Sequence, residues 1–234
     1  MSLARTCFTC SWSEPLSDSP SRPGTGKTVT IVEAIRQLLR QNPGARILAC
    51  APSNSAADLI AEKLARGLSP DELFRFYAPS RPKEAASSKL TDYTHQSQGT
   101  FSAPPMSRMS RFRVIVSTCV SASVFHGIGM PRGHFGYIFV DEAGQATEPE
   151  VMIAVKTMAD NSTRVILSGD HNQLGPIIRS NVARALGLET SYLQRLMSRD
   201  GYDEVDGFGI RFSNSGLAAA QSAHCFVLAS LSSS

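Results

Sequence analysis

Residues 23–28 read Pro-Gly-Thr-Gly-Lys-Thr, and residues 137–142 read Tyr-Ile-Phe-Val-Asp-Glu. The first stretch combines flexible glycines with a lysine and a hydroxyl, the groups that wrap a triphosphate and its Mg²⁺ at the start of a helix. The second places two carboxylates at the end of an apolar strand, where a metal ion and an attacking water would lie. Only a folded sheet can bring two such distant stretches together. The pair therefore predicts a domain that binds and hydrolyses a nucleotide.

The glycine-rich stretch fits the phosphate-binding pattern at all but one of its defined positions. The pattern is Gly, four arbitrary residues, Gly, Lys and then Ser or Thr. Ser21 stands at the first position, and residues 17–20 (Ser-Asp-Ser-Pro) make a poor strand to precede the loop. A Gly-Lys-Thr turn that merely precedes a helix is the open alternative. The predicted phosphate-binding residues are Gly24, Thr25, Gly26, Lys27 and Thr28, and Thr28 is also a predicted Mg²⁺ ligand.

Two further polar stretches complete the predicted catalytic set. We expect Asp141 to hold Mg²⁺ and Glu142 to orient the attacking water, with a pair of solvated carboxylates as the alternative. Residues 169–176 (Gly-Asp-His-Asn-Gln-Leu-Gly-Pro) follow a strand candidate, and Gln173 within them is suited to bond the γ-phosphate or the water. Here the alternative is an ordinary polar turn. The candidate catalytic residues are Lys27, Asp141, Glu142 and Gln173.

Small polar residues also follow two other strand candidates. Residues 51–55 read Ala-Pro-Ser-Asn-Ser, and residues 117–119 read Ser-Thr-Cys. Hydroxyl, amide and backbone groups of this kind suit contacts with a sugar–phosphate backbone without reading its bases. Ser53, Asn54 and Thr118 are therefore candidate RNA contacts. Capping of the following helix by Ser53 or Asn54 is the alternative, and one residue can do both.

The order of apolar and polar segments predicts an α/β fold. Strand candidates alternate with helix candidates, and such alternation indicates a mostly parallel sheet with helices on both faces. Ligands of such sheets bind at the carboxyl ends of the strands. The strand candidates are residues 46–51, 73–77, 112–117, 137–140 and 164–168, and the helix candidates are 27–40, 54–66, 121–128, 148–158 and 191–198.

Composition divides the chain into three parts. Residues 1–22 are rich in Ser and Pro and predict a disordered leader. The α/β domain is expected at 23–199, with a flexible insertion at about 78–111, because this polar stretch contains several prolines. Residues 200–234 are rich in Gly, Ser and Ala and predict a disordered or unrelated tail.

Charge, cysteine content and hydropathy set the broad class. The net charge of +3 is only mildly basic, which permits a nucleic-acid partner without arguing for one. No stretch reaches the ~18 apolar residues of a membrane span. The five cysteines do not form a disulfide framework, and Cys50 and Cys119 lie in apolar runs typical of buried thiols. We expect a cytoplasmic or nuclear protein without a membrane partner.

Three stretches resemble superfamily 1B helicases, and most closely the Moloney leukaemia virus 10 homologue (Armitage-like) RNA helicases. They are residues 47–58, residues 134–150 and residues 167–176. The Asp-Glu-Ala-Gly-Gln run at 141–145 is specific to this helicase group. The resemblance covers about residues 23–199.

This resemblance implies a RecA-like P-loop NTPase domain that uses ATP and Mg²⁺ to act on single-stranded RNA through backbone contacts. Lys27, Asp141, Glu142 and Gln173 match the family's catalytic positions. The resemblance also implies a link to RNA silencing and RNA turnover, silencing proteins as partners, and a place in the cytoplasm and its RNA granules.

A helicase of this family needs two RecA-like domains, whereas the resemblance ends near residue 199. We therefore expect the first domain only, truncated at both ends, with weak or no activity as an isolated chain. One alternative is a non-catalytic RNA- or partner-binding remnant of a helicase. Another is a truncated product that does not fold, because a missing central strand would leave apolar edges exposed.

Overall fold

The computed structural model describes residues 26–170 and 175–198 together with the backbone of 210–211 and 225–230. Helices and strands alternate along them as the sequence predicted. The main elements are α1 (Lys27–Gln41), β1 (Ile47–Ala51), α2 (Asn54–Leu64), β2 (Leu73–Arg75), β5 (Val114–Thr118), α4 (Ser123–Gly127), β6 (Tyr137–Val140), α5 (Glu148–Met158), β7 (Arg164–Gly169), α6 (Asn181–Ala185) and α7 (Tyr192–Met197). In the described residues no helix is long and apolar enough to cross a bilayer.

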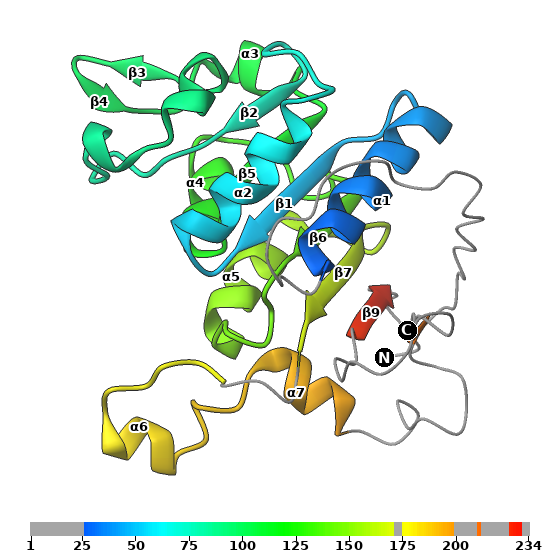
Figure 1. The fold of residues 1–234 in the computed structure, drawn as a ribbon, viewed down its shortest axis with the longest axis vertical. Coiled ribbons are helices and arrows are strands. Elements are labelled where there is room, and N and C mark those ends of the chain that lie inside the picture. Colours follow the sequence, from blue (N-terminus) through cyan, green and yellow to red (C-terminus); the bar gives the residue numbers. More distant parts are fainter. Residues whose placement is uncertain (1–25, 171–174, 199–209, 212–224, 231–234) are drawn as a thin grey trace.

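The sheet has the strand order β2-β5-β1-β6-β7-β9-β8, and its first five strands are parallel (Figure 1). Ala51 pairs with Thr118, and Cys50 pairs with Val140. This register aligns the carboxyl ends of β5, β1 and β6 at one edge, where α/β sheets bind their ligands. The predicted α/β class with a mostly parallel sheet is confirmed.

Successive strand residues supply two separate cores. Ile47 and Ala49 lie in the cluster that contains the apolar residues of α1 and α2, whereas Leu48 and Cys50 lie in the cluster that contains those of α4, α5 and α7. This alternation arises because consecutive side chains of a strand point to opposite faces. Helices therefore cover both faces of the sheet. Figure 1 shows α1 and α2 beside each other, and both pack on the same face.

The segment expected to be a flexible insertion contains more regular structure than the sequence predicted. It holds two short 3₁₀ helices, η1 (Lys83–Ala85) and η2 (Ser88–Tyr93), a hairpin of β3 (Gln96–Ser97) and β4 (Thr100–Phe101), and α3 (Met106–Met109). These short elements were not predicted, because their buried apolar residues Leu90, Phe101 and Met109 stand at isolated positions. Anchors spaced this widely leave no periodic pattern in the sequence. Flexibility of the segment stays a prediction.

The tail, predicted to be disordered or unrelated to the domain, contains two strands whose backbone the structure describes. The backbone of β9 (Cys225–Ser230) pairs antiparallel with β7, and β8 (Ile210–Arg211) pairs with β9. The outer edge of β7 offers unpaired backbone groups, and the run 225–230 has a composition suited to a strand. The predicted leader at 1–22 lies outside the described residues.

Candidate functional site

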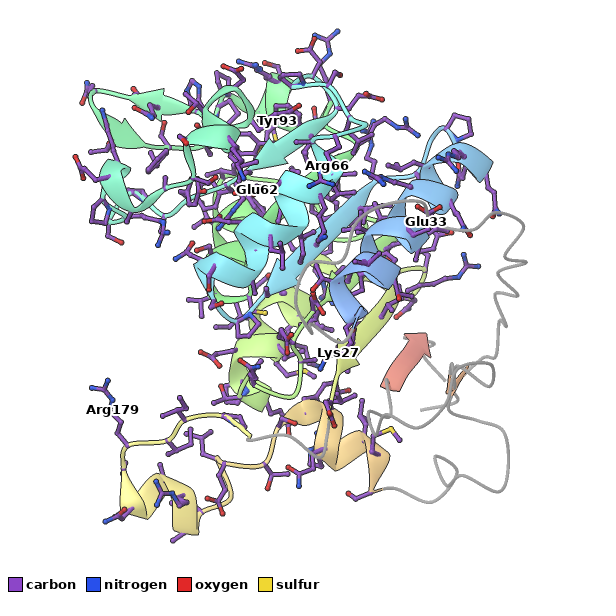
Figure 2. All side chains as sticks on the ribbon, in the orientation of Figure 1. Lys27, Glu33, Glu62, Arg66, Tyr93 and Arg179 are labelled. Carbon is purple, nitrogen blue, oxygen red and sulfur yellow. The ribbon has the colours of Figure 1, made fainter. Side chains whose placement is uncertain are left out.

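The central contact of the candidate site joins the start of α1 to the end of β6. The Thr28 hydroxyl donates a hydrogen bond of 2.8 Å to Asp141 Oδ2, across 113 residues of sequence. Lys27 is only 4% exposed and lies close enough for its charge to lower the pKa of both Asp141 and Glu142. Figure 2 shows Lys27 at the first turn of α1. The structure thus brings together two stretches that the sequence could only suggest as a pair.

Asp141 is a buried carboxylate held by three donors. Besides Thr28, the Ser168 hydroxyl donates to Asp141 Oδ1 at 3.2 Å, and the Glu142 amide donates to the same oxygen at 3.0 Å. Burial raises the pKa of Asp141, and these hydrogen bonds together with Lys27 oppose that rise. The donors therefore fix the carboxylate and stabilise its charged form. Sequence reasoning assigned Ser168 no role, although it lies within the stretch 167–176, because a single serine at a strand end does not reveal which carboxylate it bonds.

Glu142 adopts a backbone conformation that is strained for its residue type. Its φ is +52°, in the left-handed region that non-glycine residues rarely occupy. The Gln145 amide donates to Glu142 Oε2 at 3.1 Å. Burial raises the pKa of Glu142, as do the nearby charges of Asp141 and Asp170, while Lys27 lowers it. Such a group is suited to accept a proton from a water that it orients.

Two glycines let the loop between β6 and α5 (residues 141–147, the acidic loop) lie directly against the end of β7. A Cβ added at Gly144 would stand 2.5 Å from the Asp170 carbonyl oxygen, and one at Gly169 would stand 2.7 Å from the Gly144 nitrogen. The Ala143 amide donates to the Ser168 carbonyl at 2.7 Å. No side chain fits between the two backbones, so the positions of Asp141 and β7 depend on each other.

The predicted phosphate-binding loop is described only at its end. Gly26, immediately before α1, has a φ of +72°, a conformation that glycine adopts without strain. Gly24, Thr25 and Gln173 lie outside the described residues. Their predicted roles stay predictions.

The three candidate RNA contacts lie at the same edge of the sheet as Asp141, and two of them also make local contacts. Ser53 accepts a hydrogen bond of 3.2 Å from the Ala56 amide, which caps α2. The Thr118 hydroxyl donates to Ser121 Oγ at 2.8 Å. Asn54 Oδ1 accepts a hydrogen bond of 3.0 Å from Arg75. Ser53 thus caps α2, which was the alternative to RNA contact in the sequence analysis. One residue can have both roles.

The donor set at Thr28 and Asp141 fits Mg²⁺. This ion prefers oxygen ligands, and proteins usually hold it through one or two side chains while phosphate oxygens and waters complete the shell. Thr28 Oγ1 and Asp141 Oδ2 are such oxygens in direct contact. Among the residues that the structure describes, no cluster of three or more His, Cys, Asp or Glu side chains could hold a metal ion without additional ligands. A Mg²⁺ site in which the phosphates of a bound nucleotide supply the remaining ligands is consistent with this chemistry.

The fold and these contacts define a nucleotide-binding α/β domain. A family model described as an AAA domain matches residues 13–108 and 80–181, together more than half of the chain. The chain therefore belongs to the AAA domain family.

Within that class, the chain is similar to RNA helicases of the Mov10 type. It is 46% identical over 190 residues to RNA helicase Mov10l1 of Homo sapiens, covering 80% of this chain and 15% of that protein. It is 44% identical over 195 residues to putative helicase mov-10-B.1 of Danio rerio, covering 81% and 19%. It is 35% identical over 199 residues to probable RNA helicase armi of Drosophila melanogaster, covering 77% and 17%.

These similarities confirm the resemblance to the Moloney leukaemia virus 10 homologue helicases. The chain spans less than a fifth of the length of these three relatives, so it corresponds to part of such a helicase. Among solved structures, the helicase domain of Pyrococcus furiosus Hef covers 60% of this chain and 24% of that chain, with 17% identity and a TM-score of 0.36.

We expect Gly144→Ala to destabilise the fold by about 1–3 kcal/mol, because its Cβ would overlap the Asp170 carbonyl. Gly136→Ala is the matched control, since a Cβ there meets nothing within 4 Å. The measurement is urea unfolding followed by circular dichroism. Equal free energies of unfolding for the two variants would contradict the close backbone contact.

Because burial raises the pKa of Glu142, its ionisation disfavours the folded state. When the pKa of an acid is higher in the folded than in the unfolded protein, its ionisation destabilises the folded state. This destabilisation is absent at low pH and develops as the pH rises above 4.5, the ordinary pKa of a glutamate. We expect Glu142→Gln to raise the melting temperature at pH 7 and to raise it much less at pH 4. Thermal unfolding of both proteins at the two pH values measures this. A difference that does not grow with pH would show that the carboxylate is not desolvated.

Proposed function

We propose that the chain is the ATP-binding, RecA-like domain of an RNA helicase, spanning about residues 23–199. The observation that carries the proposal is the hydrogen bond from Thr28 to Asp141, which joins the phosphate-loop helix to the acidic strand end. The similarity to proteins named RNA helicases supports the same function.

On the nucleotide side, each described residue has a role that its environment suits. Lys27 and the backbone amides at the start of α1 would bind phosphate oxygens, aided by the helix dipole. Thr28 and Asp141 would hold Mg²⁺, which when bound neutralises phosphate charge. Glu142 would orient a water and accept its proton. Gln173 would contact the γ-phosphate.

On the nucleic-acid side, Ser53, Asn54 and Thr118 would contact the backbone of single-stranded RNA. Ser53 and Asn54 follow β1, the strand next to β6, and Thr118 ends β5, which pairs with β1 on its other side. The Asp141 amide donates to the Cys50 carbonyl at 2.8 Å, so the acidic loop and the end of β1 are hydrogen-bonded neighbours. A shift of the acidic loop when nucleotide binds would therefore reach the RNA-contact edge directly.

Turnover and duplex unwinding would need more than this domain. A second RecA-like domain supplies arginines to the γ-phosphate in related motors, and such arginines raise turnover by about 10³–10⁵-fold. We propose that the isolated chain binds ATP and RNA but unwinds little. By family, the complete helicase would act in RNA silencing and RNA turnover, with silencing proteins as partners, in the cytoplasm and its RNA granules.

We expect Lys27→Ala to weaken binding of a fluorescent ATP analogue with Mg²⁺ by about 10- to 100-fold, because a hydrogen bond to a charged group contributes ~1.5–3 kcal/mol. Lys156→Ala is the matched control, since this lysine of α5 is exposed. Fluorescence titration measures the affinity, and a cooperative thermal transition shows that each sample is folded.

Two results would contradict the proposal. One is the absence of saturable binding by the folded, unaltered chain. The other is equal affinity of the Lys27→Ala variant, which together with RNA affinity insensitive to nucleotide would indicate a non-catalytic RNA-binding remnant.

A further inference from the structure

Arg75, the last residue of β2, is a fully buried cation whose hydrogen bonds connect β2 to α2. Its Nε donates to Asp58 Oδ1 of α2 at 2.8 Å, and its Nη2 donates to Asn54 Oδ1 at 3.0 Å. The side chain of Arg75 is 0% exposed. A buried charge is stable only when it is paired and hydrogen-bonded, so these partners fix the guanidinium in place.

The contact with Asn54 determines which way the Asn54 amide points. Arginine has five N–H donors and no acceptor, so the group that faces it must be the oxygen Oδ1. The Asn54 NH₂ group is then directed away from Arg75, and Asn54 is half-exposed. No acceptor for this nitrogen lies among the residues that the structure describes. The amide therefore offers donors at the edge of the sheet that carries the acidic loop.

Donors are the groups that a phosphate oxygen requires, because phosphodiester oxygens accept hydrogen bonds and cannot donate them. If the Asn54 amide were rotated by 180°, it would present its carbonyl oxygen to the phosphate instead. That arrangement would be repulsive. The orientation of this single amide thus decides whether Asn54 attracts or repels an RNA backbone.

Tyr77, two residues after β2, also contacts Arg75 and its partner Asp58. The Tyr77 hydroxyl donates to Asp58 Oδ1 at 2.8 Å, and the Arg75 guanidinium lies 4.2 Å from the centre of the Tyr77 ring. Burial raises the pKa of Tyr77 to about 12, so the hydroxyl stays a donor at neutral pH. Further along, Ser87 donates to Glu62 of α2 at 2.6 Å, and Tyr93 donates to the Ala65 carbonyl at 3.2 Å. Figure 2 shows Glu62 and Tyr93 near each other.

We propose that Arg75 is a positioning residue for RNA binding: it holds Asn54 Oδ1 so that the Asn54 NH₂ group donates to a backbone phosphate of the RNA. The proposal rests on the proposed function, since it deepens the role of Asn54 in RNA contact. Asp58 and Tyr77 support it by fixing the guanidinium.

A double-mutant cycle on the full chain separates positioning from a purely structural role. Arg75→Lys keeps a positive charge beside Asp58, but one ammonium group cannot reproduce the arginine fork that reaches both Asp58 and Asn54. Binding of a fluorescein-labelled oligouridylate is measured by anisotropy for the unaltered chain, Arg75→Lys, Asn54→Ala and the double variant. We expect each single substitution to weaken binding by about 5- to 10-fold, and the double variant to be no weaker than Asn54→Ala alone. Effects that multiply would overturn the proposal.

Asn54→Asp is a second variant, which tests whether Asn54 donates to a phosphate even if Arg75→Lys does not fold. Its carboxylate still accepts the hydrogen bond from Arg75 but has no donor for a phosphate. We expect unchanged or higher thermal stability, unchanged affinity for the ATP analogue, and RNA binding weakened at least as much as in Asn54→Ala. RNA affinity equal to that of the unaltered chain would overturn the proposal. An unaltered chain that is folded and binds ATP but not RNA would overturn the RNA part of the proposed function as well.

Discussion

The hydrogen bond between Thr28 and Asp141 is the constraint on which the rest of the candidate site depends. It connects the first turn of α1 to the end of β6, and it places Lys27 near two carboxylates in a buried environment. Burial of Asp141 is unfavourable for its charge unless donors surround it. The two donors besides Thr28 come from Glu142 and from Ser168 at the end of β7. The acidic centre thus ties α1, β6 and β7 to one another.

The same edge of the sheet carries the groups proposed for both ligands. Asp141 and Glu142 follow β6, while Ser53 and Asn54 follow β1, its parallel neighbour. Backbone hydrogen bonds join the starts of the loops that follow adjacent strands, as between the Cys119 amide and the Ala51 carbonyl at 3.0 Å. Communication between a nucleotide and RNA would therefore need only small backbone shifts within a packed layer. The hydrogen bond from Arg75 fixes the side chain of Asn54 as well. Arg75 belongs to β2, which lies on the opposite side of β1 from β6 in the sheet order.

Local patterns predicted the fold because each main element carries its own signal. The predicted segments at 137–140 and 148–158 coincide with β6 and α5, and the predicted helix at 27–40 ends one residue before α1 does. The residues that sequence reasoning missed act through contacts across the fold. Ser168 and Arg75 become informative only when their neighbours in space are known. In the segment at about 78–111, the buried apolar residues stand at isolated positions, so the sequence shows no periodic pattern that would predict a helix or strand.

The Mg²⁺ dependence of nucleotide affinity tests most directly whether Thr28 and Asp141 form one metal site. A fluorescent ATP analogue is titrated with Mg²⁺ and, separately, with a chelator, using the unaltered chain, Thr28→Val, Asp141→Asn and the double variant. We predict that each single substitution removes most of the gain in affinity that Mg²⁺ brings, that the double variant loses no more, and that affinity without Mg²⁺ changes little. A full Mg²⁺-dependent gain in the folded Thr28→Val and Asp141→Asn variants would contradict a shared metal site.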